Sequence, residues 1–367
     1  MIIAILGTRG IPNNYGGFEQ FAEYLSVGLV RRGHSVIVYN PHFHDYVDCQ
    51  YQGVSIVKQW CPENLLGAST HFIYDFLCLR DATNKGVDVV LECGYQSASP
   101  SMVLIRSRNT AIVTNMDGLE WKRDKWGWFT KKITLITEKL AVKLSDVLVA
   151  DNVGIAQYLY NTYGVDSVTI PYGANVPQTI DAATPISYGL QPQAYFLLIA
   201  RLEPENNIET ILRGYLSSSS AYPFCIVGNH ETKYGAILKS RYSDARIRFL
   251  GGIYNHSVLD GLRYGASIYF HGHSVGGTNP SLLEAMACQS FICAHDNEFN
   301  RSVLGEDALY FSSPEGVVRA IDDVEKNGLL RSGFIESNLV KIQTDYTWDK
   351  IVNDYEKMFE NTVKERL

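Results

Sequence analysis

The chain has 367 residues, of which 46% are hydrophobic and 19% are charged, enough for two compact soluble domains rather than one small core. The formal net charge of -7 argues against general nucleic-acid binding, which needs a basic face. Seven cysteines, an odd number without paired short spacings, favour reduced thiols in a cytoplasmic protein over a disulfide framework or a zinc site.

The first half of the chain alternates short apolar runs with helical patterns. Residues 1–6 are too short a run for a signal peptide or a membrane span, and they predict the first strand of a buried parallel sheet. A loop over 7–12 and the glycine pair Gly16 and Gly17 lead into a helical pattern that Gly33 stops. Further strands are predicted at 36–39, 87–91, 111–114 and 147–150. This alternation predicts a doubly wound α/β domain with its ligand-binding edge at the carboxyl ends of the strands.

The second half repeats the same α/β pattern after a polar, proline-containing segment, residues 178–193, that is predicted to be a linker. Six strands are predicted at 195–200, 224–227, 247–250, 267–270, 291–294 and 308–311. We therefore expect an N-terminal domain over 1–178, a C-terminal domain over 190–345, and a final helix over 346–367 packed at the domain junction. Two such domains in tandem would face each other across a central cleft.

The most informative segment is 273–287, which runs from a strand through a glycine turn into a helix. Asn279 suits the N-cap and Pro280 the first helical position, so the N–H groups that follow should lack helical partners and can face an anion. Glu284, about a turn and a half further in, is placed to accept hydrogen bonds from sugar hydroxyls. The segment predicts a nucleotide diphosphate site, although an ordinary strand-loop-helix connection would use the same glycines for its turn.

Across essentially its whole length the chain resembles a GT-B glycosyltransferase of the retaining family 4 type. Four landmarks match in order: the glycine loop at 15–19, the segment 200–205, the glycine turn at 227–229 and the segment 273–287. The residue sequences at 7–12 and 276–280 resemble those of a narrower subgroup, the rhamnosyltransferases of capsule and O-antigen synthesis. The resemblance implies two Rossmann-like domains, a nucleotide-sugar donor and transfer with retention of configuration.

Two residues depart from the general family pattern in the donor site. Gly276 stands where the family carries a glutamate that contacts the donor sugar, and Asn206 stands where it carries a lysine beside the diphosphate arginine, Arg201. Arg201 still offers a planar fork for phosphate, Asn206 can donate a neutral hydrogen bond, and Arg9 is a candidate for the missing cation. The donor-binding residues that we expect are Gly16, Gly17, Asn206, Gly228, His273, Gly276, Gly277, Thr278, Asn279 and Ser281.

The predicted catalytic residues are Asp117, Arg201 and Glu284. Asp117 follows a strand where related enzymes often have a histidine close to the reacting carbon, although an aspartate there can also simply cap a helix or form a turn. The resemblance implies front-face displacement, in which the leaving diphosphate helps to remove the acceptor proton. Arg201, the helix N-terminus after Asn279 and glycine-loop amides would stabilise charge on the β-phosphate, so no metal is expected.

Histidine pairs give little support for a metal site. His42 with His44 and His271 with His273 alternate along extended chain without a matching carboxylate cluster, so their side chains need not converge. We therefore expect structural or substrate-contacting histidines, with His273 nearest to the donor loop.

A basic segment rich in tryptophan covers residues 121–132, with five basic residues, one acidic residue and three tryptophans. Amphipathic rings and cations together suit the headgroup layer of a membrane. The alternative is a solvated helix start whose tryptophans pack between domains. A lipid-linked acceptor, implied by the resemblance, favours peripheral contact at the cytoplasmic face of the membrane.

We predict a glycosyltransferase that moves a deoxyhexose, L-rhamnose from dTDP-L-rhamnose, to a lipid-linked saccharide in cell-surface polysaccharide synthesis. The alternatives are a transferase that uses another nucleotide-sugar, an epimerase acting on a UDP-sugar, or a nucleotide-sugar-binding assembly factor without turnover. A dehydrogenase is disfavoured because residues 7–10 lack the GxGxxG spacing, and a P-loop enzyme because no GK[ST] ending follows the glycines.

Overall fold

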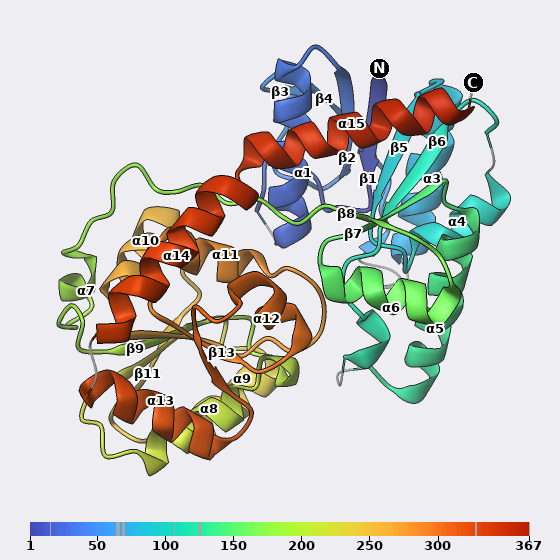
Figure 1. Ribbon diagram of the computed structural model, residues 1–367. Coiled ribbons are helices and arrows are strands. Elements are labelled where there is room, and N and C mark those ends of the chain that lie inside the picture. The colour runs from blue at the N-terminus through green and yellow to red at the C-terminus, as the bar shows by residue number, and fades with distance from the viewer. Residues whose placement is uncertain are drawn as a thin grey trace. The chain divides into compact units, whose positions relative to one another are not determined.

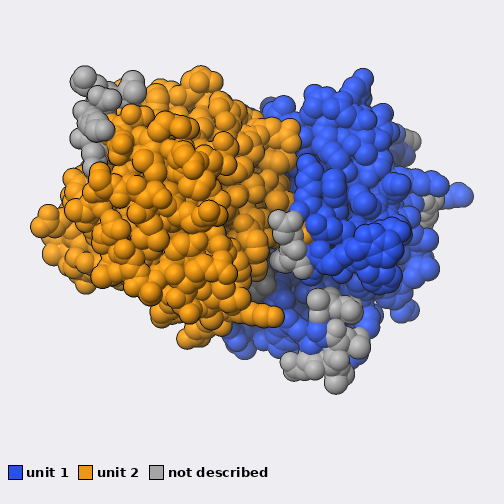
Figure 2. Space-filling view, turned by 90° about the horizontal axis from the view of Figure 1, so that it is seen from below, with its two compact units in different colours: residues 1–122, 126–172, 348–367 blue, residues 123–125, 173–347 orange. Residues whose placement is uncertain are grey.

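The computed structural model describes residues 1–14, 16–63, 67, 70–105, 107–123, 126–326 and 329–366. Its helices and strands are labelled in Figure 1, and its two compact units are coloured in Figure 2. Unit 1 comprises Met1–Lys122, Trp126–Tyr172 and Trp348–Leu367, and unit 2 comprises Arg123–Lys125 and Gly173–Thr347. The chain thus leaves unit 1 after Tyr172, ahead of the predicted boundary at 178, and its final helix is counted with unit 1.

Unit 1 is built on an eight-stranded sheet with the order β3-β4-β2-β1-β5-β6-β7-β8. Neighbouring strands are parallel except β3 and β4, which are antiparallel. The five strands predicted for this half are confirmed, whereas β3, β4 and β8 were not predicted. The strands are β1 (Ile2–Leu6), β2 (Ser35–Pro41), β3 (Gln50–Tyr51), β4 (Val54–Gln59), β5 (Val89–Cys93), β6 (Ala111–Asn115), β7 (Val147–Ala150) and β8 (Val168–Thr169).

The central strands of unit 1 are buried on both faces. In β1, Ala4 and Leu6 join a core cluster with Cys78 and Leu79 of helix α3 (Thr70–Asn84). Side chains alternate along a strand, so the equally buried Ile3 and Ile5 point to the opposite face. Burial on both faces explains why these strands read as continuous apolar runs. The other helices of unit 1 are α1 (Gly17–Arg31), α4 (Ala98–Leu104), α5 (Trp128–Leu144), α6 (Val153–Tyr163), α15 (Trp348–Arg366) and the 3-10 turn η2 (Glu120–Lys122).

The final helix, α15, packs directly on α1 within unit 1. Gly28 of α1 is the point of closest approach, because a Cβ there would lie 2.5 Å from Cγ2 of Val352. At the end of α1, the Arg32 guanidinium and the His34 ring both bind the carboxylate of Glu356, at 2.9 and 2.8 Å. These bonds, with the burial of the α15 residues Ile351, Tyr355 and Phe359, make the last helix an integral layer of unit 1.

Unit 2 is built on a six-stranded sheet with the order β11-β10-β9-β12-β13-β14, parallel throughout. All six strands predicted for this half are confirmed. They are β9 (Phe196–Ile199), β10 (Phe224–Val227), β11 (Ile247–Gly251), β12 (Ile268–His271), β13 (Ile292–His295) and β14 (Leu309–Phe311).

Helices cover both faces of the unit 2 sheet. Figure 1 shows α8 and α13 below the sheet and α10, α11 and α14 above it, and the helices of each group pack on one another. Their bounds, with those of the shorter helices, are α7 (Thr184–Ser187), η3 (Pro204–Asn206), α8 (Ile208–Ser217), α9 (Lys233–Arg241), α10 (His256–Gly265), α11 (Pro280–Ala287), α12 (Glu298–Leu304), α13 (Pro314–Lys326) and α14 (Leu329–Asp345).

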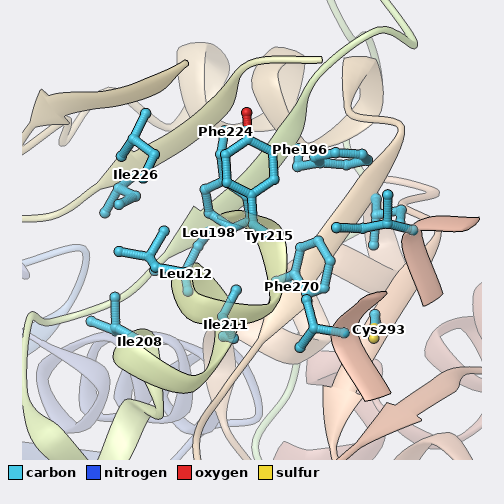
Figure 3. Close-up of a cluster of buried hydrophobic side chains, with 14 of the residues drawn as sticks. Phe196, Leu198, Ile208, Ile211, Leu212, Tyr215, Phe224, Ile226, Phe270 and Cys293 are labelled. Atoms are coloured by element: carbon cyan, nitrogen blue, oxygen red, sulfur yellow. The ribbon is translucent and has the colours of Figure 1, made fainter. Parts of the chain in front are cut away.

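An aromatic cluster forms the core between the sheet of unit 2 and α8. Figure 3 shows Phe196, Phe224 and Phe270, from three adjacent strands, gathered around Tyr215 of α8. Ring centroids lie 5.2 Å apart between Tyr215 and Phe224, and 5.4 Å apart between Phe224 and Phe270. Such pairs stabilise a core beyond the area that they bury, and they hold rigid the strands whose carboxyl ends carry the candidate site.

The segment predicted as a linker, 178–193, packs onto unit 2. Its short helix α7 lies against α10, where Pro185 Cγ would be 2.5 Å from a Cβ at Gly265 and Thr184 Oγ1 2.5 Å from a Cβ at Gly261. Proline and polar residues are typical of a loop, which is why the sequence predicted a linker. In the structure, Pro185 and Thr184 pack instead against two glycines of α10, Gly265 and Gly261.

We predict that Gly28→Ala lowers the free energy of unfolding by about 1–3 kcal/mol, because its methyl group would overlap Val352. Urea denaturation would measure this loss, and the double variant Gly28→Ala/Val352→Ala should lose less than the sum of the two single variants. Gly333→Ala, at a helical position with no atom within 4 Å of the added carbon, is the control and should not be destabilised. Strict additivity in the double variant would contradict the packing described.

Candidate functional site

The candidate site of unit 2 lies where three adjacent parallel strands end. Arg201 follows β9, Gly228 follows β10 and His273 follows β12. Parallel strands bring their carboxyl ends to one edge, which is where ligands bind in doubly wound sheets. At Gly228 the approach is tight, because a Cβ there would lie 2.3 Å from the carbonyl oxygen of Ala200.

Asn206 joins the segment that carries Arg201 to the segment that carries His273. Its Nδ2 donates to the Arg201 carbonyl oxygen at 2.7 Å, so its Oδ1 is left to accept from Nδ1 of His273 at 3.0 Å. Burial, together with the charges of Arg123 and Arg201, lowers the pKa of His273 to about 3. The ring is therefore neutral at physiological pH, with its proton on Nδ1. The neutral hydrogen bonds expected of Asn206 are made within the protein.

The two segments also meet through their backbones. A Cβ at Gly272 would lie 1.9 Å from the carbonyl oxygen of Asn206, so no side chain fits at this position. Asn207, in the left-handed conformation with φ 50°, donates from Nδ2 to the Gly272 carbonyl oxygen at 2.8 Å and to Ser274 Oγ at 3.0 Å. Ser274 in turn donates its N–H and hydroxyl to the carbonyl oxygen of Glu205, at 3.1 and 2.9 Å.

Two asparagines near the start of α12 fix the backbone of His273. Nδ2 of Asn297 and Nδ2 of Asn300 both donate to the His273 carbonyl oxygen, at 3.1 and 3.0 Å. Sequence reasoning missed both residues. The sequence does show an asparagine at a helix N-cap and a second asparagine three positions later. It does not show that both side chains bind the His273 carbonyl oxygen, which only the fold reveals.

Helix α11 begins as predicted, with Asn279 as its N-cap and Pro280 at the first position. The expectation that the following amides lack partners is wrong, however. Ser281 N–H donates to Asn279 Oδ1 at 2.9 Å, and the N–H groups of Leu282 and Leu283 donate to the Asn279 carbonyl oxygen at 3.0 and 3.3 Å. The side-chain cap and the tight first turn take up these donors, so the helix offers an anion mainly the positive end of its dipole.

The turn before α11 requires glycine at Gly276, where φ is 105°. Gly277 and Thr278 continue this turn to Asn279, and Thr278 is buried. Gly276, where the resemblance implied a glutamate in related chains, therefore has a backbone role that a glutamate would fill only with strain.

Glu284 and Ser281 belong to a polar network that the sequence did not reveal. The guanidinium of Arg263, on α10, donates from Nη2 to Glu284 Oε2 at 2.5 Å and to Ser281 Oγ at 3.4 Å. Ser281 Oγ also lies 2.8 Å from the hydroxyl of Tyr269. Arg263 is 1% exposed, and nothing in the sequence of an amphipathic helix separates a buried arginine from a solvated one.

Arg201 is the exposed cation of this edge. Across the part of the chain that the structure describes, its guanidinium makes no hydrogen bond or ion pair within the protein. The planar guanidinium of an arginine at a strand end, without an acidic partner among the described residues, is suited to bind a phosphate group through two N–H donors.

In unit 1, Asp117 follows β6 in a left-handed conformation, with φ 49°. Its N–H donates to Asn115 Oδ1 at 3.0 Å, and the hydroxyl of the buried Tyr172 lies 3.5 Å from its Oδ1. A non-glycine residue held in this region stores backbone strain, which is more frequent at functional sites than elsewhere. The role predicted for Asp117 in catalysis stays a prediction.

The glycine loop of unit 1 is described except for Tyr15, which lies outside the described residues. Gly16 is the N-cap of α1 and Gly17 its first residue. Arg9, the candidate for a missing cation, forms an ion pair with Glu63 at 2.9 Å, and its N–H donates to Glu19 Oε1 at 2.8 Å. In this structure its charge is therefore already compensated.

The first histidine pair of the sequence, His42 with His44, binds backbone amides. His42 Nδ1 accepts from the N–H of Cys61 and His44 Nδ1 from the N–H of Tyr46, each at 3.1 Å. Within the described ranges, no group of three or more His, Cys, Asp or Glu side chains is arranged to hold a metal ion.

Comparisons with known proteins agree with this architecture. Residues 2–175 match the family model described as "Domain of unknown function (DUF1972)", and residues 187–339 match "Glycosyl transferases group 1". Over 99% of both chains, the structure is similar to sucrose-phosphate synthase from Thermosynechococcus elongatus, with TM-score 0.82 and 15% identity. The catalytic domain of starch synthase IV from Arabidopsis thaliana, bound to ADP and acarbose, matches 99% of both chains with TM-score 0.75 and 13% identity.

The chain has the GT-B fold. An uncharacterized glycosyltransferase of Methanocaldococcus jannaschii is 25% identical over 243 residues, 61% of this chain and 61% of that protein, so the chain spans about three fifths of the length of this relative. The group 1 match contains Arg201, Asn206, His273 and Glu284, and with the structural neighbours it supports a glycosyltransferase family. The first half matches a family to which no function is assigned.

Acid should destabilise unit 2 through His271. Burial and the nearby His273 and His295 lower the pKa of His271 to about 3, against about 6.5 for an unfolded histidine. The stability that this neutral ring contributes is complete above pH 6.5 and is lost as the pH falls from 6.5 toward 3. Between pH 7.5 and pH 5 the loss is about 2 kcal/mol.

Urea denaturation of wild type and His271→Phe at these two pH values would measure this component. The phenylalanine variant cannot titrate, so its stability should fall by about 2 kcal/mol less than that of wild type. His271→Gln gives the same comparison if the larger apolar ring disturbs folding. Equal acid losses in wild type and both variants would contradict the assignment.

Proposed function

We propose that the protein is a glycosyltransferase whose unit 2 binds a nucleotide-sugar donor. The observation that carries this proposal is the match of residues 187–339 to group 1 glycosyl transferases, in a unit where Arg201 stands exposed beside two loops fixed by Asn206 and Gly272. Arg201 and the N-terminus of α11 offer positive charge to the diphosphate.

The proposed reaction forms a bond between an acceptor hydroxyl oxygen and the anomeric carbon while the bond from that carbon to the diphosphate breaks, and the hydroxyl proton passes to the leaving diphosphate. Negative charge then develops on the leaving phosphate, and a cation held in advance lowers the barrier most effectively. We assign this stabilising role to Arg201. Glu284 is assigned to accept hydrogen bonds from sugar hydroxyls, and Asp117 to contact the donor sugar near the reacting carbon. Retention of configuration and independence from metal are parts of the proposal.

We propose L-rhamnose from dTDP-L-rhamnose as the donor, supported by the sequence spellings at 7–12 and 276–280 and by Gly276 itself. The specific alternative is a UDP-sugar. A structural neighbour is described as an α,α-trehalose-phosphate synthase (UDP-forming) from Burkholderia xenovorans, with TM-score 0.71 and 11% identity over 98% of this chain and 99% of that chain. A UDP-sugar epimerase and a binding protein without turnover are the other candidates.

The acceptor side of the proposal rests on α5 of unit 1. This helix buries its polar residues Thr134, Thr137 and Glu138 and exposes apolar ones, among them Trp128 (70% exposed), Phe129 (69%) and Ile136 (59%). Lys132 Nζ lies 4.0 Å from the centre of the Trp128 ring. An exposed apolar face flanked by lysines fits the interface of an anionic bilayer, and we propose that it brings a lipid-linked saccharide acceptor to the enzyme.

Trp121, in the same basic segment, does not belong to this face. Trp121 packs near Tyr158, with centroids 6.2 Å apart, and residues 124 and 125 lie outside the described residues. No helix in the described part of the chain is long and apolar enough to cross a membrane.

The direct test is a transfer assay with the purified full chain, a panel of nucleotide-sugars that includes dTDP-L-rhamnose and UDP-sugars, and lipid-linked acceptors, with products read by mass. We expect an acceptor-dependent product that contains deoxyhexose, and equal turnover with and without EDTA. Conversion of a nucleotide-sugar without acceptor would indicate an epimerase. Binding without any product would indicate an assembly factor, and a loss in EDTA that metal restores would contradict the metal-independent mechanism.

Arg201→Ala should weaken nucleoside-diphosphate binding by about 10- to 100-fold, since a charge-assisted contact to phosphate is lost. Calorimetry with UDP and dTDP would measure the change. The matched control is Arg241→Ala on α9, which removes an exposed arginine that pairs with Glu209 at 2.6 Å. Unchanged affinity in a folded Arg201→Ala variant would remove this residue from the site.

Replacing Lys122, Lys131 and Lys132 by glutamine should release the protein from acidic liposomes, because each cation near an anionic surface contributes about 1 kcal/mol. Sedimentation at low salt would measure binding, and high salt should release wild type as well. The control removes three exposed lysines elsewhere, Lys233, Lys357 and Lys364. If wild type does not sediment at low salt, or if both triple variants lose binding equally, α5 is not the membrane contact.

A further inference from the structure

Arg263 is a fully buried charged side chain that no part of the proposed mechanism uses. It lies on α10 with its side chain 2% exposed, directly behind Glu284 of α11, whose side chain is 24% exposed. Its Nη2 donates to Glu284 Oε2 at 2.5 Å. The carboxylate thus lies between the buried guanidinium and the surface.

The hydrogen bonding of this guanidinium is incomplete. Nε and Nη1 have no hydrogen-bond partner among the described residues; Asp260 Oδ1 lies 3.6 Å from Nη1. Asp260 is itself engaged by the thiol of Cys288 at 3.2 Å. Burial lowers the pKa of Arg263, but the negative groups around it, Glu284 first, outweigh burial and raise it.

A buried cation of this kind is stable only beside an ionised partner. The dependence is mutual, because the guanidinium also holds the Glu284 carboxylate in place through this hydrogen bond. Tyr269 and Ser281 extend this support, since Ser281 Oγ contacts both the tyrosine hydroxyl and Arg263.

We propose that Arg263 is the positioning residue of the donor site: by holding Oε2 of Glu284 from behind, it orients that carboxylate to accept a hydrogen bond from a hydroxyl group of the nucleotide-sugar. This role rests on the proposed function. Arg263 acts only through Glu284, because its own side chain is shielded from any ligand.

The pairing has a consequence for substitutions at Glu284. Glu284→Gln removes the charge that compensates a buried guanidinium, so it should destabilise the fold as well as weaken donor binding. Removing both charges, in Arg263→Met/Glu284→Gln, should recover stability but not binding. Stability and binding can therefore be separated in one set of variants.

The experiment is a double-variant cycle on the full chain, with binding of UDP, dTDP, GDP and ADP measured by calorimetry and melting temperature measured in parallel. For the tightest of these probes, Glu284→Gln should lower affinity about tenfold in the wild-type background and less than twofold in Arg263→Met. Arg263→Lys, which keeps the charge but loses the planar fork, serves as a second background if the methionine variant does not fold. A merely structural arginine would give additive losses.

Additive losses, or wild-type affinity in folded Arg263 variants, would overturn the role of Arg263. If wild type binds none of the four probes, the proposed donor site fails, and the role of Arg263 fails with it.

Discussion

The candidate site of unit 2 depends on the contact between the backbone of Asn206 and Gly272. The carbonyl oxygen of Asn206 occupies the space that a Cβ at position 272 would need, 1.9 Å away. This approach sets the spacing between the segment that carries Arg201 and the one that leads into α11. In the proposed donor site a phosphate group would meet both segments at once, and displacements of about 1 Å are costly in such sites. The absence of a side chain at Gly272 is therefore as important as the presence of one at Arg201.

Neutral groups make most of the bonds around this contact. Asn206, Asn207, Asn297 and Asn300 join the loops through amides, and the pKa of His273 is too low for it to carry charge at physiological pH. The charged groups near it are Arg201, the pair of Arg123 with the buried Glu205 at 3.8 Å, and the internal pair of Arg263 and Glu284. A framework of neutral bonds holds its shape independently of these charges, and in the proposed site Arg201 and the dipole of α11 would offer positive charge to the diphosphate.

The sequence was informative where local physics dominates. Every apolar run predicted as a strand is one, because parallel strands buried on both faces need such runs, and the cap at Asn279 follows from side-chain chemistry alone. The sequence was uninformative where a residue's burial or hydrogen-bond partner depends on a segment far away in the chain. The burial of Arg263, the acceptor of the asparagines of α12 and the exposed apolar face of α5 all depend on which elements lie alongside. Residues 178–193 show the same limit, since polar composition cannot reveal that α10 carries two glycines to receive them.

The return of α15 to unit 1 separates the order of synthesis from the order of folding. Unit 2 lies almost entirely in one continuous stretch, whereas unit 1 is completed only by residues that follow that stretch. On the ribosome, α15, which packs on α1 and brings Trp348 next to Phe21, emerges only after all of unit 2 has been made. Unit 1 therefore keeps apolar surface exposed until α15 has been made, whereas unit 2 can fold before then. A fragment that ends at Tyr172 would remain in this immature state.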